Sequence, residues 1–300
     1  MSRVKTKRII AIVGPTASGK SSLGIELAKK FDGEIVNGDS RQIYRSMNIG
    51  TDKPHIVNGC VEDIPHHLFD VADPVELLGV AEFQHLAYEA IDSVLKRGKL
   101  PILVGGSGYY VQSVVEGWEF PRVIRDQRLR QGLEHEPTTT ESLKELFDTL
   151  AALDPATATI INRNNKRRLI RAIEIAQSQG ARMPLQRVPR YESLVIGIQT
   201  NRDELYKKID ARIDEMLASG LEKEVRELGA RYGWTPVLRS TIDYAEWEDC
   251  LGTDARGKIS HTTLELIRAT LQRNHRALVK KQMTWFRKQK HIRWIENLES

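Results

Sequence analysis

The chain has 300 residues, which is enough for one large domain or two modest domains with their own hydrophobic cores. Hydrophobic residues make up 40% of the sequence and charged residues 28%, a composition that is typical of a globular protein and excludes a disordered one. The net charge of +5 points only weakly to a polyanionic partner, because 45 basic side chains are set against 40 acidic ones.

The N-terminal apolar run, IIAIV at residues 9–13, is shorter than a signal-peptide core and leads directly into a glycine-rich loop. No stretch approaches the roughly 20 apolar residues that span a bilayer. Cys60 and Cys250 are too few for a disulfide framework and lack metal-type spacing, which favours a reducing compartment. We therefore expect a cytoplasmic protein that has no contact with a membrane.

Short apolar runs predict β-strands along the chain. They lie at residues 8–13, 34–37, 101–104, 194–198 and 292–295. Helical patterns separate most of these runs, and this alternation is typical of a parallel sheet with helices on both faces. The fold class is therefore predicted to be α/β.

Two helices show clear helical spacing of their apolar residues. The first covers about residues 80–95 and is expected to end at Gly98. The second begins near Asn201, with Glu204 placed as in a capping box. Its apolar stripe continues from Leu205 to Val225, so we expect one long helix.

Between Pro121 and Pro189 the alternation with strands stops and the sequence becomes arginine-rich and helix-like. We interpret residues 121–190 as a mainly helical insertion domain. The core would then be discontinuous, with residues 1–120 as its first part and residues 191–300, including basic C-terminal helices, as its second part.

Basic side chains are concentrated in two segments. Residues 163–171 contain five Lys or Arg, and residues 268–293 contain nine with no Asp or Glu. Such segments suit phosphate contacts with a nucleic acid, although a solvated helix face is the plainer interpretation of the second one.

The segment GPTASGKS fits the pattern G-x-x-x-x-G-K-[ST], with a predicted strand before it and a predicted helix after it. In this context the backbone N–H groups converge on one anion, Lys20 reaches a terminal phosphate, and Ser21 can bind Mg²⁺. The sheet is therefore expected to be P-loop NTPase-like, although a glycine-rich turn that binds nothing is the alternative. The residues expected to bind a diphosphate are Gly14, Pro15, Thr16, Ala17, Ser18, Gly19, Lys20 and Ser21.

A carboxylate, Asp39, follows the next predicted strand. Ligands of open α/β sheets bind at the carboxyl ends of strands, so Asp39 could act as a general base. The plainer alternative is that Asp39 caps the following helix or pairs with Arg41. The strand at 101–104 ends in LVGGSGYY, without the acid that an ATPase would carry there.

Taken together, these segments resemble the tRNA dimethylallyltransferase (IPP transferase) family over nearly the whole chain. The resemblance depends on GPTASGKS, GDSRQIYRSMNIGTDKP (38–54), PHHLFD (65–70), LVGGSGYY (103–110), RRLIRAIE (167–174) and KKQMTWFR (280–287). Their order and spacing make it far more specific than the P-loop motif alone.

The resemblance implies transfer of a dimethylallyl group from dimethylallyl diphosphate to the exocyclic amino nitrogen of the adenosine on the 3′ side of the anticodon, with release of diphosphate. It implies that the P-loop holds the donor diphosphate with Mg²⁺, that Asp39 is the general base, and that Ser107 contacts both donor and target base. It also makes residues 121–190 a tRNA-binding domain. The residues expected to contact the anticodon stem-loop are Asp39, Ser40, Arg41, Gln42, Ser107, Arg130, Arg167, Arg168, Leu169, Ile170, Arg171 and Tyr244.

Two positions depart from the family pattern. Asn165 stands where an Asp usually precedes the paired arginines, and Asp243, in TIDYAE, stands where the pattern reads I-G-Y. A C-terminal zinc finger is not expected, because no cysteine and histidine cluster follows Trp294. A monomer is expected.

Three other interpretations remain open at this point. An adenylate isopentenyltransferase would prenylate a free nucleotide, but such a small acceptor needs no arginine-rich insertion. A small-molecule P-loop kinase would use Asp39 to activate a hydroxyl group. A tRNA-binding protein without catalysis would leave the match at Lys20, Asp39 and Ser107 unexplained.

Overall fold

The computed structural model describes residues 7–121, 138–179, 186–251 and 259–296, which fold into two compact units. Unit 1 consists of Met1–Gly117 and Pro189–Ser300, and unit 2 of Trp118–Val188. The insertion was predicted at 121–190, so the boundaries of unit 2 lie within a few residues of that prediction. Among the described residues, no helix is long and apolar enough to cross a bilayer.

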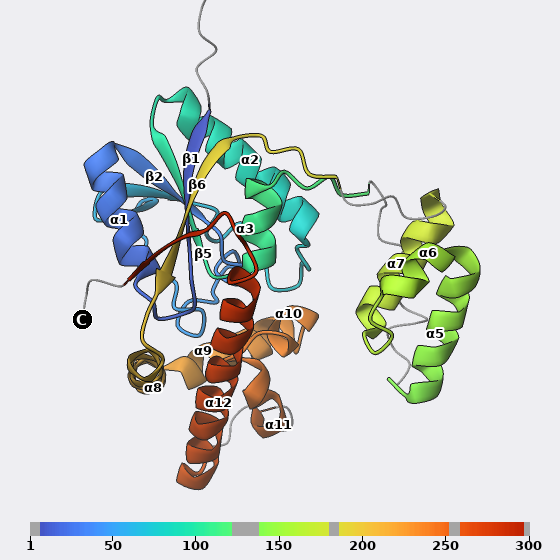
Figure 1. The fold of residues 1–300 in the computed structure, drawn as a ribbon. Helices are drawn as coiled ribbons and strands as arrows, with labels where there is room; N and C mark the ends of the chain where they lie inside the picture. Colours follow the sequence, from blue (N-terminus) through green and yellow to red (C-terminus); the bar gives the residue numbers. More distant parts are fainter. Residues whose placement is uncertain (1–6, 122–137, 180–185, 252–258, 297–300) are drawn as a thin grey trace, which may run out of the picture. The chain divides into compact units, whose positions relative to one another are not determined.

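Unit 1 is built on a seven-stranded sheet in the order β3-β4-β2-β5-β1-β6-β7 (Figure 1). The pairs β1–β5, β1–β6, β2–β5, β2–β4 and β6–β7 are parallel, and only β3 runs antiparallel to its neighbour. The predicted α/β class is confirmed. The strands are β1 (Arg8–Val13), β2 (Gly33–Asn37), β3 (Cys60–Val61), β4 (Ile64–His67), β5 (Leu100–Gly105), β6 (Glu192–Gln199) and β7 (Arg293–Glu296).

All of the strands expected from apolar runs are present, within two residues at either end. The sequence interpretation missed β3 and β4. Both are short, and β4 contains Pro65, His66 and His67 in place of an apolar run, so neither has a recognisable pattern.

Each face of the sheet has its own hydrophobic core, because side chains alternate along the strands. On one face α1 (Lys20–Phe31) packs against Ile12, Ile35 and Ile102 through Ala28. The other face contributes Ala11 and its alternate neighbours to the larger core, which α2 (Val80–Lys96), α3 (Gly108–Val115) and the C-terminal helices share.

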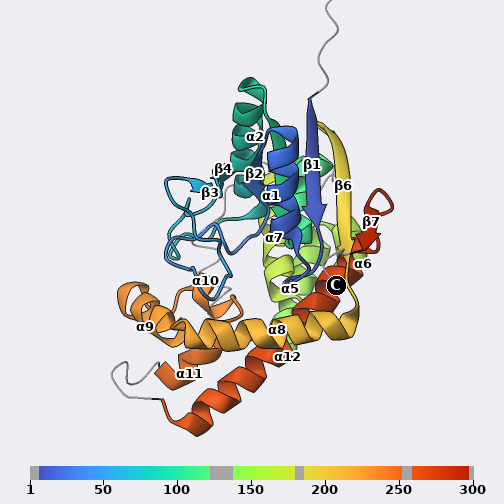
Figure 2. The same cartoon turned by 90° about the vertical axis from the view of Figure 1, so that its left-hand side faces the viewer.

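The remaining helices of unit 1 follow β6 and lie beyond the carboxyl ends of β1 and β6 (Figures 1 and 2). They are α8 (Arg202–Ala218), α9 (Leu221–Tyr232), α10 (Pro236–Arg239), the 3₁₀ helix η1 (Ala245–Trp247), α11 (Glu248–Leu251) and α12 (His261–Phe286). The loops at the carboxyl edge of the sheet therefore face a layer of helices.

The prediction of one long helix after Asn201 was wrong in its extent. Asn201 does cap α8, since its side-chain oxygen accepts from the backbone N–H of Asp203. The chain then breaks at Gly220, which has φ 100° and begins α9. A left-handed glycine ends a helix whatever apolar stripe continues past it.

Unit 2, in its described part, contains three helices: α5 (Thr140–Leu153), α6 (Pro155–Ile160) and α7 (Lys166–Gln179). A separate small core joins them, with Leu146 and Leu150 of α5 packed against Leu169, Ile170 and Ile173 of α7. Its two ends are linked by a hydrogen bond from the Glu119 N–H to the Gln186 carbonyl.

Glu224 of α9 fixes the loop that follows Tyr44. Its carboxylate accepts hydrogen bonds from the backbone N–H groups of Asn48, Ile49 and Gly50, at 2.8–3.1 Å. The Tyr244 hydroxyl donates to the same carboxylate at 2.6 Å. A single carboxylate thus satisfies four donors and ties α9 and the segment before η1 to the edge of the sheet.

We expect Glu224→Gln to lower the free energy of unfolding by about 2 to 3 kcal/mol, because the amide offers one acceptor oxygen and turns its NH₂ group toward donors. Urea denaturation followed by tryptophan fluorescence measures the change. The control is Glu227→Gln on the same helix, whose side chain is 67% exposed. Equal stability of the two variants would contradict this role for Glu224.

Candidate active site

The P-loop has the backbone geometry of an anion cradle. Gly14 and Gly19 have φ values of 154° and 84°, and Ala17 is also left-handed at 61°. Gly19 is the N-cap of α1, so the N–H groups of the first helical turn point into the loop. Ser18 is fully buried, with its hydroxyl lacking a protein partner among the described residues.

Lys20 lies in the cradle and donates to the Pro15 carbonyl. Desolvation by burial, together with the nearby Arg212, lowers the pKa of this ammonium group to about 8, although Asp39 and Asp52 act in the opposite direction. A bound polyanion would remove this penalty. The loop is therefore electrostatically poised for an anion.

Asp39 lies in a turn that Asn37, the fully buried last residue of β2, holds in place. The Asn37 side chain accepts from the Asp39 N–H at 2.8 Å and donates to the Leu68 carbonyl at 3.0 Å. One Asp39 carboxylate oxygen accepts from the Arg41 N–H at 2.8 Å, as in an Asx turn. Asn37 was not assigned a role from the sequence, although a polar residue inside an apolar strand was a usable signal.

Ser107 is brought to Asp39 by a close approach of two glycines. The Gly38 N–H donates to the Val104 carbonyl at 2.7 Å, and a Cβ atom on Gly105 would lie only 2.2 Å from the Gly38 carbonyl carbon. The Ser107 hydroxyl oxygen then accepts from the Ser40 N–H at 3.0 Å and lies 3.1 Å from the Ser40 hydroxyl. The structure therefore places Asp39, Ser40 and Ser107 together.

Arg41 and Gln42 lie at the same edge but make protein contacts. The Arg41 guanidinium donates to the Ser240 carbonyl at 3.1 Å. The Gln42 amide donates to the carbonyls of Thr51 and Asp52 at 3.0 and 2.9 Å. Both side chains also line the cavities described below.

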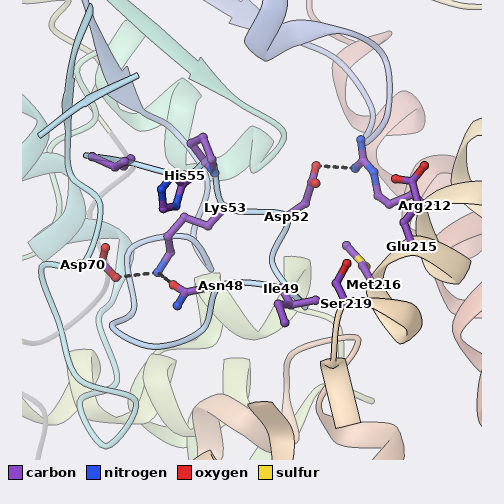
Figure 3. Close-up of a pocket in the computed structure, with 12 residues that line it drawn as sticks. Asn48, Ile49, Asp52, Lys53, His55, Asp70, Arg212, Glu215, Met216 and Ser219 are labelled. Carbon is purple, nitrogen blue, oxygen red and sulfur yellow. Dashed lines mark hydrogen bonds and ion pairs between the residues drawn. The ribbon is translucent and has the colours of Figure 1, made fainter. Parts of the chain in front are cut away.

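Two residues of the site were missed from the sequence, Arg212 on α8 and Gln282 on α12. The Arg212 guanidinium donates to the Thr16 hydroxyl at 2.9 Å and pairs with the Asp52 carboxylate at 2.8 Å (Figure 3). The Gln282 side chain accepts from the Thr16 N–H at 3.0 Å and donates to the Gly106 carbonyl at 3.1 Å. Only tertiary contacts single them out.

Two cavities meet at this edge. The first, of about 300 Å³, follows the P-loop and has mainly polar walls. The second, of about 440 Å³, has mainly apolar walls that include Tyr110, Met216, Ile242 and Trp285. Their shared lining residues are Thr16, Asp39, Thr51, Asp52, Gly106, Arg212 and Gln282. A polar anion cavity therefore continues into an apolar one, with Asp39 at the junction.

A third cavity, of about 440 Å³, is also lined by the Arg212–Asp52 ion pair (Figure 3). Within it the Lys53 ammonium is bound to Asp70 at 2.7 Å and to Asn48 at 3.1 Å. Lys53 is only 3% exposed, and its contacts tie the loop that carries Asp52 to the end of the PHHLFD segment.

Mg²⁺ was expected at Ser21. The described residues contain no cluster of three His, Cys, Asp or Glu side chains that could hold a metal without a ligand. Ser21 lines the polar cavity together with the carboxylates of Asp39 and Asp52. Mg²⁺ typically binds through one or two protein groups plus substrate phosphates, so this donor set fits Mg²⁺ arriving with a diphosphate.

The structure does not offer the Tyr244 side chain to RNA, contrary to the prediction. Tyr244 is 0% exposed, and a Cβ atom on Gly50 would lie 2.7 Å from its ring. Burial raises the pKa of its phenol well above the usual value, and the hydroxyl donates to Glu224. Its role is packing beneath the Gly50 loop.

Leu169 and Ile170 are also buried, in the core of unit 2, so their side chains are not available to RNA either. Arg167 and Arg168 are exposed on α7, whereas Arg171 is paired with Glu174 at 2.9 Å. Arg130 lies outside the described residues.

The basic segment 268–293, most of which lies on α12, divides into two parts. Arg268 and Arg276 are ion-paired with Asp214 and Asp210 of α8, at 2.6 Å each. Lys280, Lys281 and Lys288, by contrast, are exposed beside a groove of about 390 Å³ floored by Trp285. The basic side chains of the N-terminal part thus join α12 to α8, whereas those of the C-terminal part expose their positive charge to solvent.

Comparison with known proteins matches residues 42–289 to the model of the IPP transferase family. A tRNA dimethylallyltransferase of Desulforudis audaxviator is 40% identical over 96% of this chain and 91% of its own length. The crystal structure of the tRNA isopentenylpyrophosphate transferase from Bacillus halodurans has a TM-score of 0.69 and 38% identity, covering 97% of this chain and 90% of that one. The chain belongs to the IPP transferase family.

A eukaryotic dimethylallyltransferase, crystallised while acting on tRNA, has a higher TM-score of 0.79 at 26% identity. That match covers 98% of this chain and 75% of the eukaryotic one. The family's fold therefore extends over both units of this chain.

Both departures from the family pattern have a structural account. Asn165 accepts from the Arg168 N–H at 3.1 Å at the start of α7, and Asn caps a helix about as well as Asp does. Asp243 has φ 78°, a conformation for which glycine is the default residue. In this IPP transferase its carboxylate is bound to His275.

We expect the affinity of the enzyme for pyrophosphate to be steady up to about pH 7 and to fall as pH rises through about 8, because Lys20 then loses its charge. Isothermal titration calorimetry measures this. In the Lys20→Arg variant the side chain keeps its positive charge above pH 8. The part of the affinity loss that comes from titration of the protein should therefore disappear. An unchanged pH profile in that variant would contradict the assignment.

Gln282→Leu keeps the side-chain volume but leaves the Thr16 N–H and the Gly106 carbonyl without their partner. We expect pyrophosphate binding to be weaker by up to about 30-fold, since two hydrogen bonds of about 1 kcal/mol each are lost. The control is Gln289→Leu, which removes one long contact of 3.4 Å to the Trp285 carbonyl. Equal affinity in both variants would show that Gln282 does not position the P-loop.

Proposed function

We propose that this protein transfers a dimethylallyl group from dimethylallyl diphosphate to the exocyclic amino nitrogen of the adenosine on the 3′ side of the anticodon in tRNA, releasing diphosphate. Membership of the IPP transferase family supports the reaction class. The observation that carries the proposal is the junction of a polar anion cavity with an apolar one, with Asp39 in the wall of both.

The two cavities match the two ends of a prenyl diphosphate. The P-loop, Lys20 and Arg212 supply cationic and N–H groups for the diphosphate head. The apolar cavity accommodates the hydrocarbon tail and excludes water, which would otherwise capture the cation-like allylic carbon. A nucleoside triphosphate would leave this apolar space without a function.

Asp39 serves as the general base. The lone pair of an adenine amino group is delocalised into the ring, so the nitrogen attacks usefully only as its proton leaves. One carboxylate oxygen of Asp39 accepts the hydrogen bond from the Arg41 N–H. The other oxygen accepts the proton from the amine. Ser107, whose hydroxyl accepts from the Ser40 N–H, lines the same cavity as Asp39 and would contact the same base.

Negative charge develops on the diphosphate as the allylic carbon–oxygen bond breaks. Loop N–H groups, Lys20 and Arg212 are fixed before the reaction, so they stabilise this charge without reorganisation. Mg²⁺ held by Ser21 and a nearby carboxylate would add Lewis-acid stabilisation of the same phosphate oxygens.

The acceptor is the anticodon stem-loop. Its target base is unpaired, so extruding it into the site costs only a few kcal/mol. Phosphate contacts come from Arg167 and Arg168 of unit 2, from Arg130, and from the exposed Lys280, Lys281 and Lys288, and they make binding salt-dependent. We further propose that the enzyme acts as a monomer in the cytoplasm.

Incubation with unmodified tRNA and either dimethylallyl diphosphate or ATP tests the function. Nucleoside mass spectrometry should find one C₅H₈ unit added to a single adenosine with the prenyl donor, and no modification with ATP. Phosphoryl transfer from ATP to an acceptor, without prenylation, would overturn the proposal.

Asp39→Asn should lower kcat by about 100-fold or more, because it removes the base while keeping an oxygen for the Arg41 N–H. The Kd for tRNA and for pyrophosphate should change less than about threefold. Asp63→Asn, at an exposed turn between β3 and β4, is the control. Near-normal turnover in Asp39→Asn would rule out the general-base role.

A further inference from the structure

Met216 of α8 lines two cavities, the apolar cavity of the active site and the third cavity (Figure 3). The Arg212–Asp52 ion pair lines both of them as well. Among the described residues that the two linings share, Met216 is the only apolar one. Its side chain is 6% exposed and therefore fills the space where the two cavities adjoin.

The rest of this boundary is held by backbone contacts. Ile49 lines the third cavity, whereas Gly50, the next residue, lines the apolar cavity. The Glu224 carboxylate accepts from the N–H groups of both residues, at 2.8 and 3.1 Å. Because this loop is fixed, the Met216 side chain decides whether the two cavities are separate or joined.

Met216 also lies at a suitable distance from the P-loop. It follows Arg212 by four residues on α8, so the two side chains point to the same side of the helix. The Arg212 guanidinium binds the Thr16 hydroxyl of the P-loop. One helical turn advances about 5.4 Å, which is comparable to the length of a dimethylallyl group. A short tail that extends from the P-loop along α8 therefore ends at Met216.

The walls of the apolar cavity differ in their exposure to solvent. Tyr109 is 43% exposed and Lys281 is exposed, whereas Asp243 and His275 are buried, as Met216 is. A base that belongs to a tRNA must enter where the wall is accessible. The donor tail is then left with the buried part of the cavity, beside Met216.

We propose that Met216 sets the length of the prenyl group that this enzyme transfers, because its side chain closes the third cavity to the donor tail. The inference rests on the proposed function and deepens it, since it names the residue that limits the donor to dimethylallyl size. A longer donor would react in the same way. Its allylic carbon–oxygen bond breaks, diphosphate leaves, the adenine nitrogen bonds to that carbon, and the amine proton goes to Asp39.

The third cavity can accept the end of a longer tail once Met216 is shortened. Its volume is about 440 Å³, and Ile49 and Ile56 are among its apolar lining residues. The Lys53 ammonium in its wall is already bound to the Asp70 carboxylate. A hydrocarbon that enters this space therefore leaves that ion pair intact.

The test compares dimethylallyl diphosphate with geranyl diphosphate, which is one isoprene unit longer, as donors for unmodified tRNA. In the wild type, kcat/KM for the geranyl donor should be lower by about 100-fold or more, since a packed wall does not accommodate the added bulk. Met216→Ala should raise the ratio of geranyl to dimethylallyl transfer by about tenfold or more. The ratio comes from one enzyme sample, so a loss of folded protein cancels.

Three further variants complete the test. Met216→Val shortens the side chain less than Met216→Ala and should raise the ratio by a smaller factor. Ile209→Ala is the matched control, because Ile209 is a 1% exposed residue of α8 that is absent from the described linings of both cavities. It should leave the ratio unchanged. Ser219 lines only the third of these two cavities, so Ser219→Phe, added to Met216→Ala, should return the ratio toward the wild-type value.

A wild-type ratio near one overturns the inference and leaves the proposed function standing. A ratio that neither Met216→Ala nor Met216→Val raises has the same consequence, and so does a rise that Ile209→Ala reproduces or Ser219→Phe fails to reverse. If the wild type transfers no prenyl group from either donor, the proposed function is wrong and this inference with it.

Discussion

The whole site depends on the close approach of two chain segments at the carboxyl ends of β2 and β5. A Cβ atom on Gly105 would lie 2.2 Å from the Gly38 backbone, and one on Gly38 would lie 2.9 Å from the Val111 side chain, so neither position has room for a side chain. This approach brings the turn that carries Asp39 against the loop that carries Ser107, which the Ser40 contacts then hold in place. Because both segments follow buried parallel strands, the rigid sheet core sets their positions.

From this junction the P-loop is held by residues far away in the sequence. Gln282 joins the loop to Gly106, and Arg212 joins it to Asp52, while a Cβ atom on Gly108 would lie 2.3 Å from the Trp285 ring. The helices beyond the sheet edge thus complete the cavity walls. The glycines of the LVGGSGYY segment are explained by this packing, since Gly106 and Gly108 lie directly under Gln282 and Trp285.

Electrostatics and shape separate the two ends of the site. The polar end combines the side chains of Lys20 and Arg212 with the N–H groups of a helix N-terminus. The two positive charges repel each other until an anion binds between them. The apolar end is the larger of the two cavities, and its walls are mainly apolar, with the buried Asp243–His275 ion pair among its lining residues.

The sequence by itself determined what depends on local patterns. The apolar runs located five of the six described strands that pair in parallel, the glycine spacing located the P-loop, and the position of Asp39 after a strand placed it at the ligand edge. Short β3 and β4, the break at Gly220, and the roles of Arg212, Gln282 and Asn37 depend on contacts between distant segments. Burial of Tyr244, Leu169 and Ile170 was likewise decided by packing. Local patterns indicate the backbone conformation of a segment and which of its faces is buried. Only the tertiary structure decides which side chains from distant segments meet at the edge of the sheet.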